Sequence, residues 1–166
     1  MERPRRRLVI TLVLAVLALV LGGGLVWIRM DLAAARAAAE EREAALRAAG
    51  VHAVSLLSID HRTVDQDLKR ILSTSTGAAR EAYAKEAPAR RKATLDHKVT
   101  QTGVVRSAGL VAMNGDRTAA DVLVVADALI RWEGAKDAPE ERFYRWTMRV
   151  SKVGSAWLVE KAEQVP

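Results

Sequence analysis

The stretch ADVLVVADALIRW, residues 120–132, decides the fold class because its apolar side chains follow a period of two. One set of alternate positions runs through Val122 and Val124 to Trp132, whereas the other set includes charged residues such as Asp121. Successive side chains of a β-strand point to opposite faces of a sheet. The stretch therefore predicts a strand with one buried face and one partly exposed face.

Three further stretches predict the other strands of one antiparallel sheet. Residues 99–113 run into a turn signal at Asn114-Gly115, and residues 156–163 follow a second turn at Gly154-Ser155. Residues 144–151 alternate most regularly between apolar and polar side chains. The predicted inner face of the sheet, which would form the core or line an apolar cavity, holds Val122, Val124, Tyr144, Trp146 and Met148.

Helical patterns occupy the chain before the first strand. Residues 32–58 predict one long helix or two joined helices, and about ten residues from Val64, ended by the break at residues 73–77, predict an amphipathic helix. The sequence Thr-Val-Asp-Gln at residues 63–66 predicts a capping box at the start of the second of these segments. A third helix is expected from about residue 78 to residue 98, interrupted or restarted near Pro88. Helices followed by antiparallel strands indicate an α+β domain with helices on one face of the sheet.

The N-terminal part of the chain predicts where this domain is located. From Leu8 to Ile28 the sequence contains no charged side chain, and a helix of this length spans roughly the 30 Å hydrocarbon core of a bilayer. Four arginines between residues 3 and 7 precede the run. By the positive-inside rule, we expect a single-pass plasma-membrane protein with a cytoplasmic N-terminus and an extracytoplasmic C-terminal domain.

The end of the uncharged run favours an uncleaved anchor over a signal peptide. The run is longer than the apolar region typical of a signal peptide, which has about 7–15 residues. Trp27 and Arg29 suit the membrane interface, and no clear cleavage site follows them. Gly22, Gly23 and Gly24 would let a second helix approach closely, including that of another copy in a homo-oligomer, although glycine is also common in membrane helices.

These patterns divide the chain into four expected parts. Residues 1–7 form a basic cytoplasmic tail, residues 8–28 a transmembrane helix, residues 29–49 a helical stalk, and residues 50–166 the extracytoplasmic domain. The formal net charge of the chain is +6. Without Glu2 and the five arginines at positions 3, 5, 6, 7 and 29, 21 basic and 19 acidic residues remain, so the rest of the chain carries only +2. This nearly neutral balance argues against a nucleic-acid partner.

The sequence contains histidine, aspartate and serine residues, but none of them has the spacing of a known catalytic or metal-binding motif. His52, His61 and His97 lack metal-ligand spacing and are interpreted as surface or boundary residues. Asp60 and Asp67 are interpreted as helix caps and helix-start residues instead of a catalytic pair. The sequence contains no cysteine, phosphate loop, nucleophile elbow or HExxH motif. It therefore predicts no catalytic residue, no cofactor and no metal site.

Several short segments form a pattern that extends over nearly the whole chain. After the basic tail, the membrane helix and an alanine-rich stalk, the most specific segments are LLSIDHRTVDQDL at residues 56–68 and Thr76-Gly77. Weaker segments are Ala82-Tyr83, Val104-Val105, residues 120–124, Tyr144-Arg145 and residues 157–159. The pattern resembles the Mce-associated membrane proteins of actinobacteria.

The resemblance implies a nuclear transport factor 2-like fold, in which a curved antiparallel sheet wraps against a few helices and makes a cone. It also implies that the protein accompanies an Mce-type transporter, which moves lipids or sterols across the cell envelope, and helps to assemble or stabilise it without being an enzyme. The expected partners are the lipid bilayer and the subunits of that transporter.

Two other functions fit the same expected architecture. One is a scaffold of a type IV secretion or conjugation machine, similar to the VirB-class inner-membrane proteins. The other is a carrier of a small hydrophobic ligand, which requires a cavity in the cone. If Trp132, Tyr144 and Trp146 fill the cone as core residues, the carrier hypothesis fails.

Overall fold

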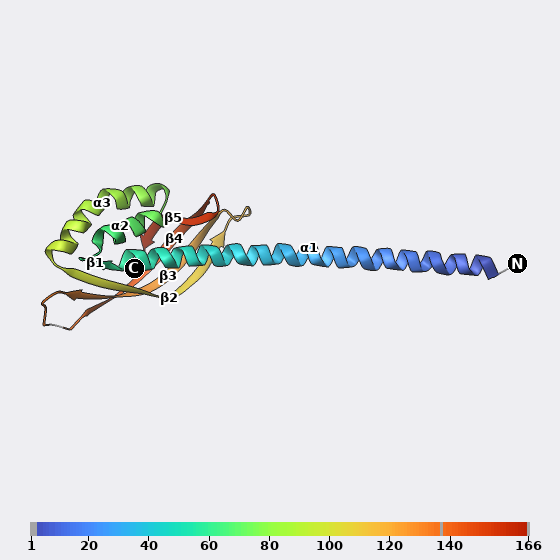
Figure 1. Ribbon diagram of the computed structural model, residues 1–166, viewed down its shortest axis with the longest axis horizontal. Coiled ribbons are helices and arrows are strands. Elements are labelled where there is room, and N and C mark those ends of the chain that lie inside the picture. Colours follow the sequence, from blue (N-terminus) through green and yellow to red (C-terminus); the bar gives the residue numbers. More distant parts are fainter. Residues whose placement is uncertain (1–2, 137, 166) are drawn as a thin grey trace. The chain divides into compact units, whose positions relative to one another are not determined.

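The computed structural model describes residues 3–136 and 138–165, with side chains described from residue 17 onward except at residues 18 and 20. The chain divides into two compact units, residues 1–40 and 41–166, and helix α1 (Arg3–Leu57) contributes residues to both. The second unit contains two further helices, α2 (Val64–Ser73) and α3 (Gly77–Asp96), and one β-sheet (Figure 1).

The described residues of the first unit, 3–40, belong to α1, and the large apolar side chains that are described there are exposed. Leu21, Leu25 and Trp27 are 64%, 55% and 71% exposed. A Cβ added at Gly22, Gly23 or Gly24 would meet no atom within 4 Å. Of the predicted span, the side chains of residues 8–16, 18 and 20, Leu8 included, lie outside the described residues.

In the part of the chain that the structure describes, no helix has the length and apolar character needed to cross a membrane.

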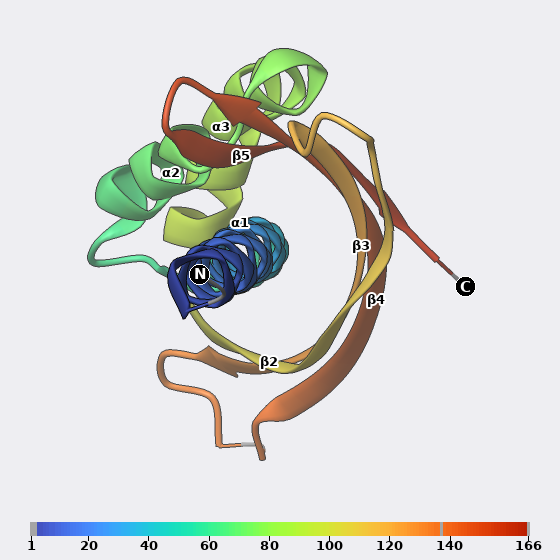
Figure 2. The ribbon, with the colours of Figure 1, turned by 90° about the vertical axis from the view of Figure 1, so that its right-hand side faces the viewer.

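The sheet of the second unit has five strands in sequence order, and every neighbouring pair is antiparallel. The strands are β1 (Ile59–Asp60), β2 (Val99–Met113), β3 (Ala119–Trp132), β4 (Glu140–Val153) and β5 (Ala156–Gln164). The pairing register shifts twice between β2 and β3 and once between β4 and β5. Irregularities of this kind increase the local bend and twist of a strand. Figure 2 shows the result, a sheet that curls strongly, with α2 and α3 on its open side.

The concave face of the sheet packs against the part of α1 that belongs to the second unit. The alanines at positions 45, 49 and 53 recur every four residues, form one stripe along the helix and are fully buried. Their small side chains let the helix lie close to the buried side chains of β3 and β4. On the sheet, Val122 pairs with Met148 and Val124 pairs with Trp146, so the apolar positions of both strands share one face. The predicted α+β class, with helices and a curled antiparallel sheet, is confirmed.

The segment between α2 and α3 joins the helices to the edge strand β5. Ser75 forms a parallel bridge with Val159, and the Thr76 amide donates to the Val159 carbonyl at 2.8 Å. Gly77 has a φ of +49°, and a Cβ there would lie 3.3 Å from the Glu160 side chain. The Thr76-Gly77 pair therefore lets the chain leave the sheet and begin α3 in a small space.

Helix α3 runs through Pro88 without the interruption that the sequence predicted. Proline lacks the amide that would bond the carbonyl of residue 84. Ala84 and Pro88 are both exposed, so water can satisfy that carbonyl. The predicted break is therefore wrong, because the defect lies on the solvent side of the helix.

The end of α1 crosses the sheet closely at Gly103 of β2. A Cβ added at Gly103 would lie only 2.3 Å from the Leu57 Cβ. The Gly103 amide donates to the Ser58 hydroxyl at 3.2 Å. Only a glycine permits this approach of helix and strand.

Candidate functional site

A cavity of about 500 Å³ lies inside the second unit. Most of its walls are apolar side chains from the end of α1, from α3 and from strands β1, β2, β4 and β5. The apolar lining residues are Leu56, Leu57, Ile59, Ala93, Val99, Tyr144, Trp146 and Ala162. Its volume falls in the range of small-molecule sites, roughly 300–1,000 Å³.

One face of α3 supplies the polar side of the cavity. Tyr83 and Arg90 are spaced seven residues apart, so they lie along one face of the helix, and His97, the C-cap residue of α3, follows at the same spacing; all three line the cavity. Across from them, Gln101 of β2 and Gln164 of β5 add amide groups to the lining. The site therefore combines an apolar wall with a few hydrogen-bonding groups and one cation.

His52, on α1, stands behind Tyr83 and is fully buried. Its Nδ1 lies 2.8 Å from the Thr74 hydroxyl, and its Nε2 lies 3.3 Å from the Tyr83 hydroxyl. The Thr74 hydroxyl donates to backbone carbonyls of α2, at 3.0 Å from that of Ile71. Thr74 must therefore accept from Nδ1–H, which leaves Nε2 to accept from the Tyr83 hydroxyl. This arrangement joins α1, α2 and α3 at one neutral imidazole.

Burial sets the protonation of this pair. Loss of water around the ring lowers the pKa of His52 to about 4, because the charged form is poorly solvated. Burial also raises the pKa of Tyr83. The interpretation of His52 as a surface or boundary histidine is wrong. Its position three residues after Ala49, on the buried stripe of α1, was the available signal.

The predicted inner-face residues occupy two different environments. Val122, Val124 and Met148 are completely buried in the core. Tyr144 and Trp146 line the cavity, with their rings stacked at a centroid distance of 5.1 Å and an interplanar angle of 12°. They leave the cavity open because they pack on each other.

Trp132 does not fill the cone either, since it lies at the end of β3 and is 37% exposed. The prediction that it belongs to the buried face is wrong, because Trp132 is the last residue of β3 and pairs with the first residue of β2 at the end of the sheet.

Residues 56–68 form a hydrogen-bonded change of chain direction around Asp67, the Asp67 corner. They do not form a pair of catalytic carboxylates. The buried Asp67 carboxylate accepts from the Asp60 amide at 3.0 Å and from the Thr63 hydroxyl at 2.9 Å, and it pairs with Arg70 at 3.1 Å. Asp60 in turn accepts from the Arg62 amide at 2.8 Å, a hydrogen bond that lowers its pKa. The predicted capping box is wrong because the Thr63 hydroxyl donates to Asp67 and does not cap α2. The corner fixes the path of the chain from α1 through β1 into α2.

The two other histidines, His61 and His97, lie outside the core. His61 has an Nδ1 atom without a hydrogen-bond partner of good geometry, although the Asp60 carboxylate lies 3.4 Å away and Glu133 lies 3.5 Å from its Nε2. Lys98 also pairs with Glu133, at 3.2 Å, and lowers the pKa of that carboxyl group. Among the described residues, no group of three His, Cys, Asp or Glu side chains is placed to hold a metal ion.

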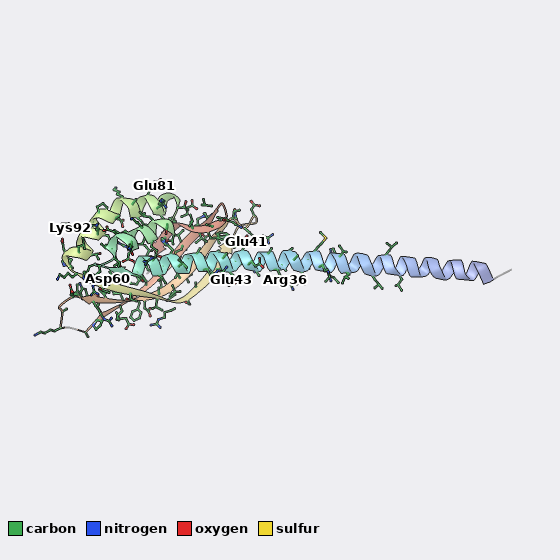
Figure 3. All side chains as sticks on the ribbon, in the orientation of Figure 1. Arg36, Glu41, Glu43, Asp60, Glu81 and Lys92 are labelled. Carbon is green, nitrogen blue, oxygen red and sulfur yellow. The ribbon has the colours of Figure 1, made fainter. Side chains whose placement is uncertain are left out.

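Glu41 marks the point where α1 enters the second unit (Figure 3). Its carboxylate accepts from the Trp157 indole N–H at 2.9 Å and forms an ion pair with Lys152. The Lys152 hydrogen bond, and then the Trp157 one, lower the pKa of Glu41. These contacts fasten the beginning of the buried helical stripe to β4 and β5.

Known structures share this fold at low sequence identity. The VirB8 protein of Agrobacterium tumefaciens superimposes with a TM-score of 0.61 over 76% of this chain and 92% of that one, at 11% identity. An IcmL-like type IV secretion system protein of Legionella pneumophila gives a TM-score of 0.58 over 73% of this chain and 89% of that one, at 10% identity. At such identities the likeness concerns the fold alone.

A relative in sequence comes from Mycobacterium tuberculosis (strain ATCC 25618 / H37Rv), the uncharacterized protein Rv1363c. The two are 27% identical over 148 residues, which make up 88% of this chain. The match spans about half, 54%, of the length of that relative. The family described as "Uncharacterized protein Rv1363c/MT1408-like" matches residues 7–166, so the chain belongs to this family.

Proposed function

We propose that the protein is a non-catalytic, membrane-anchored accessory subunit that assembles or stabilises an Mce-type lipid or sterol transport complex in the cell envelope. The observation that carries the proposal is that one family match, residues 7–166, includes both the uncharged run of residues 8–28 and the α+β domain. A family that keeps an anchor and a domain together suits a protein whose position beside a partner matters.

The membrane anchor rests on the sequence and on the exposed side chains of the first unit. Large apolar residues from Leu17 to Leu32 are about half exposed or more, and they include Trp27 and Ile28. Apolar surface of this extent requires an apolar surrounding or a partner. A bilayer meets that need, with the arginines before the run held in the cytoplasm and Arg29 at the outer interface.

The link to Mce-type transporters rests on the resemblance of residues 56–68 and of Thr76-Gly77. Both segments have demanding local roles, because the first forms the Asp67 corner and the second joins α3 to β5. The resemblance is therefore supported by residues that shape this domain in particular.

A second candidate function is a scaffold of a type IV secretion machine. The fold likeness to VirB8 and to the IcmL-like protein, with TM-scores of 0.61 and 0.58, favours it. Both candidates assign the same task to the chain, which is to hold a domain outside the membrane for a partner. They differ in the partner.

Copurification distinguishes the partners. The full chain would be extracted from membranes in a mild detergent and isolated through a C-terminal tag, and the proteins that accompany it identified by mass spectrometry. We expect Mce-type transporter subunits. Recovery of secretion or conjugation components without them would favour the scaffold and overturn the leading proposal.

Membrane anchoring needs a separate measurement. A double variant, Leu17→Arg with Leu21→Arg, places two charges near the middle of the run and should release the protein from membranes washed with carbonate, because each charge at the centre of a membrane helix is unfavourable by about 2.5–3.5 kcal/mol. Arg36→Leu with Arg47→Leu, a matched pair of changes outside the run, should leave the protein in the membrane fraction. If the wild-type chain is itself released by carbonate, the anchor is disproved.

A further inference from the structure

The cavity of the second unit contains a cation without an internal partner. Arg90 is partly buried and lines the cavity, and among the described residues no carboxylate lies within 4.0 Å of its guanidinium group. Glu86 lies one turn earlier on α3, at the spacing that favours an ion pair, yet the structure forms none there. Other arginines of the same region are paired, since Arg91 binds Asp65 at 2.7 Å and Arg70 binds Asp67 at 3.1 Å.

The cavity around Arg90 has a polar side and an apolar side. Gln101 and Gln164 can donate amide hydrogens into the same space. The remaining walls are apolar residues of α1 and β1 and the stacked rings of Tyr144 and Trp146 from β4. A ligand that fits both sides has an anionic group at one end and a hydrocarbon body.

We propose that this cavity binds a single-chain amphipathic carboxylate, with the carboxylate on Arg90 and the hydrocarbon chain against Leu56, Leu57 and Trp146. The planar guanidinium group matches a carboxylate in a two-point hydrogen-bonded contact. One arginine balances one negative charge, which suits a carboxylate better than a phosphate monoester with its charge of about −1.5 to −2. The inference goes beyond the proposed function and does not depend on the transporter partner.

Hydrogen bonds behind the cavity walls hold the lining residues in place without a ligand. Tyr83 is held by the neutral His52, which is itself fixed by Thr74. Thr94 of α3 is buried, and its hydroxyl donates to the Arg90 carbonyl at 2.9 Å. The backbone that carries Arg90 is therefore ordered by contacts that do not involve a ligand, and a preformed site loses less entropy on binding.

Calorimetric titration of the full chain in lipid nanodiscs would test the proposal. Sodium octanoate, octanol and octylammonium chloride share one hydrocarbon chain and differ in head-group charge. Heats measured with empty nanodiscs would be subtracted to remove partition into the bilayer. We expect octanoate to bind more tightly than octanol by roughly fivefold, because a charged hydrogen bond to a partly buried group is worth about 1 kcal/mol, and octylammonium to bind more weakly than either.

Three variants connect the binding to the cavity. Arg90→Gln should reduce the preference for octanoate over octanol to none, whereas Lys85→Gln removes the same charge from an exposed position on the same helix and should leave it unchanged. Ala93→Phe fills the mouth of the cavity and should abolish binding of all three compounds. Circular dichroism would verify that Ala93→Phe remains folded, and the Arg90 and Lys85 pair tests the proposal independently of that variant.

Two results would overturn the proposal. Equal affinity for octanoate and octanol, unchanged by Arg90→Gln, would show an apolar site without anion recognition. An absence of saturable heat for octanoate in the wild-type chain would show that the cavity takes up no such ligand. Neither result would bear on the transporter partner, which copurification tests separately.

Discussion

The curled sheet is filled differently in its two halves, although one helix and one sheet build both. In the packed half, the alanine stripe of α1 lies against Val122, Met148 and Val150, and these side chains are fully buried. In the open half, α1 ends at Leu57 and the chain turns into β1, so no helix fills the space in front of Tyr144. A single change of backbone direction therefore separates a core from a cavity.

Truncation of Met148 should produce the largest effect on this comparison. Met148→Ala leaves a void in the packed half and should lower the free energy of unfolding by about 2–5 kcal/mol. Tyr144→Leu, in the open half, loses mainly the ring stacking with Trp146 and should lower it by about 0.5–1.5 kcal/mol. Urea unfolding followed by circular dichroism measures both. Equal losses would show that the two halves are packed alike.

The pH dependence of stability should depend on His52, the buried imidazole that joins α1, α2 and α3. His52 has a folded pKa of about 4 and an ordinary value of 6.5. The unfolded chain therefore binds more protons between these values, so the stability contributed by neutral His52 is complete above pH 6.5 and is lost as the pH falls to 4. The loss should reach about 3 kcal/mol.

The control for this prediction is His52→Phe, which cannot titrate. The difference in unfolding free energy between wild type and variant should shrink from pH 7 to pH 4. A difference that stays constant over this interval would show that His52 does not titrate differently in the folded and unfolded chains.

Gly103 tests the point where the packed half ends. Gly103→Ala forces a Cβ against the Leu57 Cβ and should lower the free energy of unfolding by about 1–3 kcal/mol, as overpacking does. Gly109→Ala is the matched control on the same strand, because a Cβ there meets no atom within 4 Å. We expect little change or a small gain from it. Thermal unfolding of both variants would decide, and equal melting temperatures would contradict the close approach.

Tyr83→Phe should have the smallest effect. It removes the hydroxyl that donates to His52 Nε2 at 3.3 Å and should lower the free energy of unfolding by about 0.5–1.5 kcal/mol. The same change makes the cavity wall less polar without altering its shape. Denaturant unfolding at pH 7 measures it, and an increase in stability would contradict the hydrogen bond.

The alternation of apolar residues predicted the sheet because a strand repeats every two residues whatever it packs against. Val122, Val124 and Met148 therefore lie in the core as a group. The same alternation could not distinguish core from cavity at Tyr144 and Trp146, because that depends on where α1 ends. It also placed Trp132 in the buried face, although this residue lies at the end of the sheet, where β3 ends.

Local signals failed where a distant residue competed for the same group. Thr63 has the spacing of a capping residue, but its hydroxyl donates to the Asp67 carboxylate, which also accepts from the Asp60 amide in the corner between β1 and α2. The polar side of the cavity could have been found from the seven-residue spacing of Tyr83 and Arg90 on α3 and of His97 at its C-cap. The apolar walls could not, since they come from six elements that only the fold brings together.

The alanine stripe of α1 also has a consequence for the order of folding. The strands β2 to β5 follow one another as hairpins, so each pairing closes a short loop, and such local contacts form early. The contact between the Ala45–Leu57 part of α1 and Val150 joins segments far apart in the chain, and its loop is slow to close. On a growing chain α1 leaves the ribosome before the strands that cover its alanine stripe are made. We expect the alanine stripe of α1 to remain uncovered, and open to other apolar segments, until β4 and β5 are made and synthesis is nearly complete.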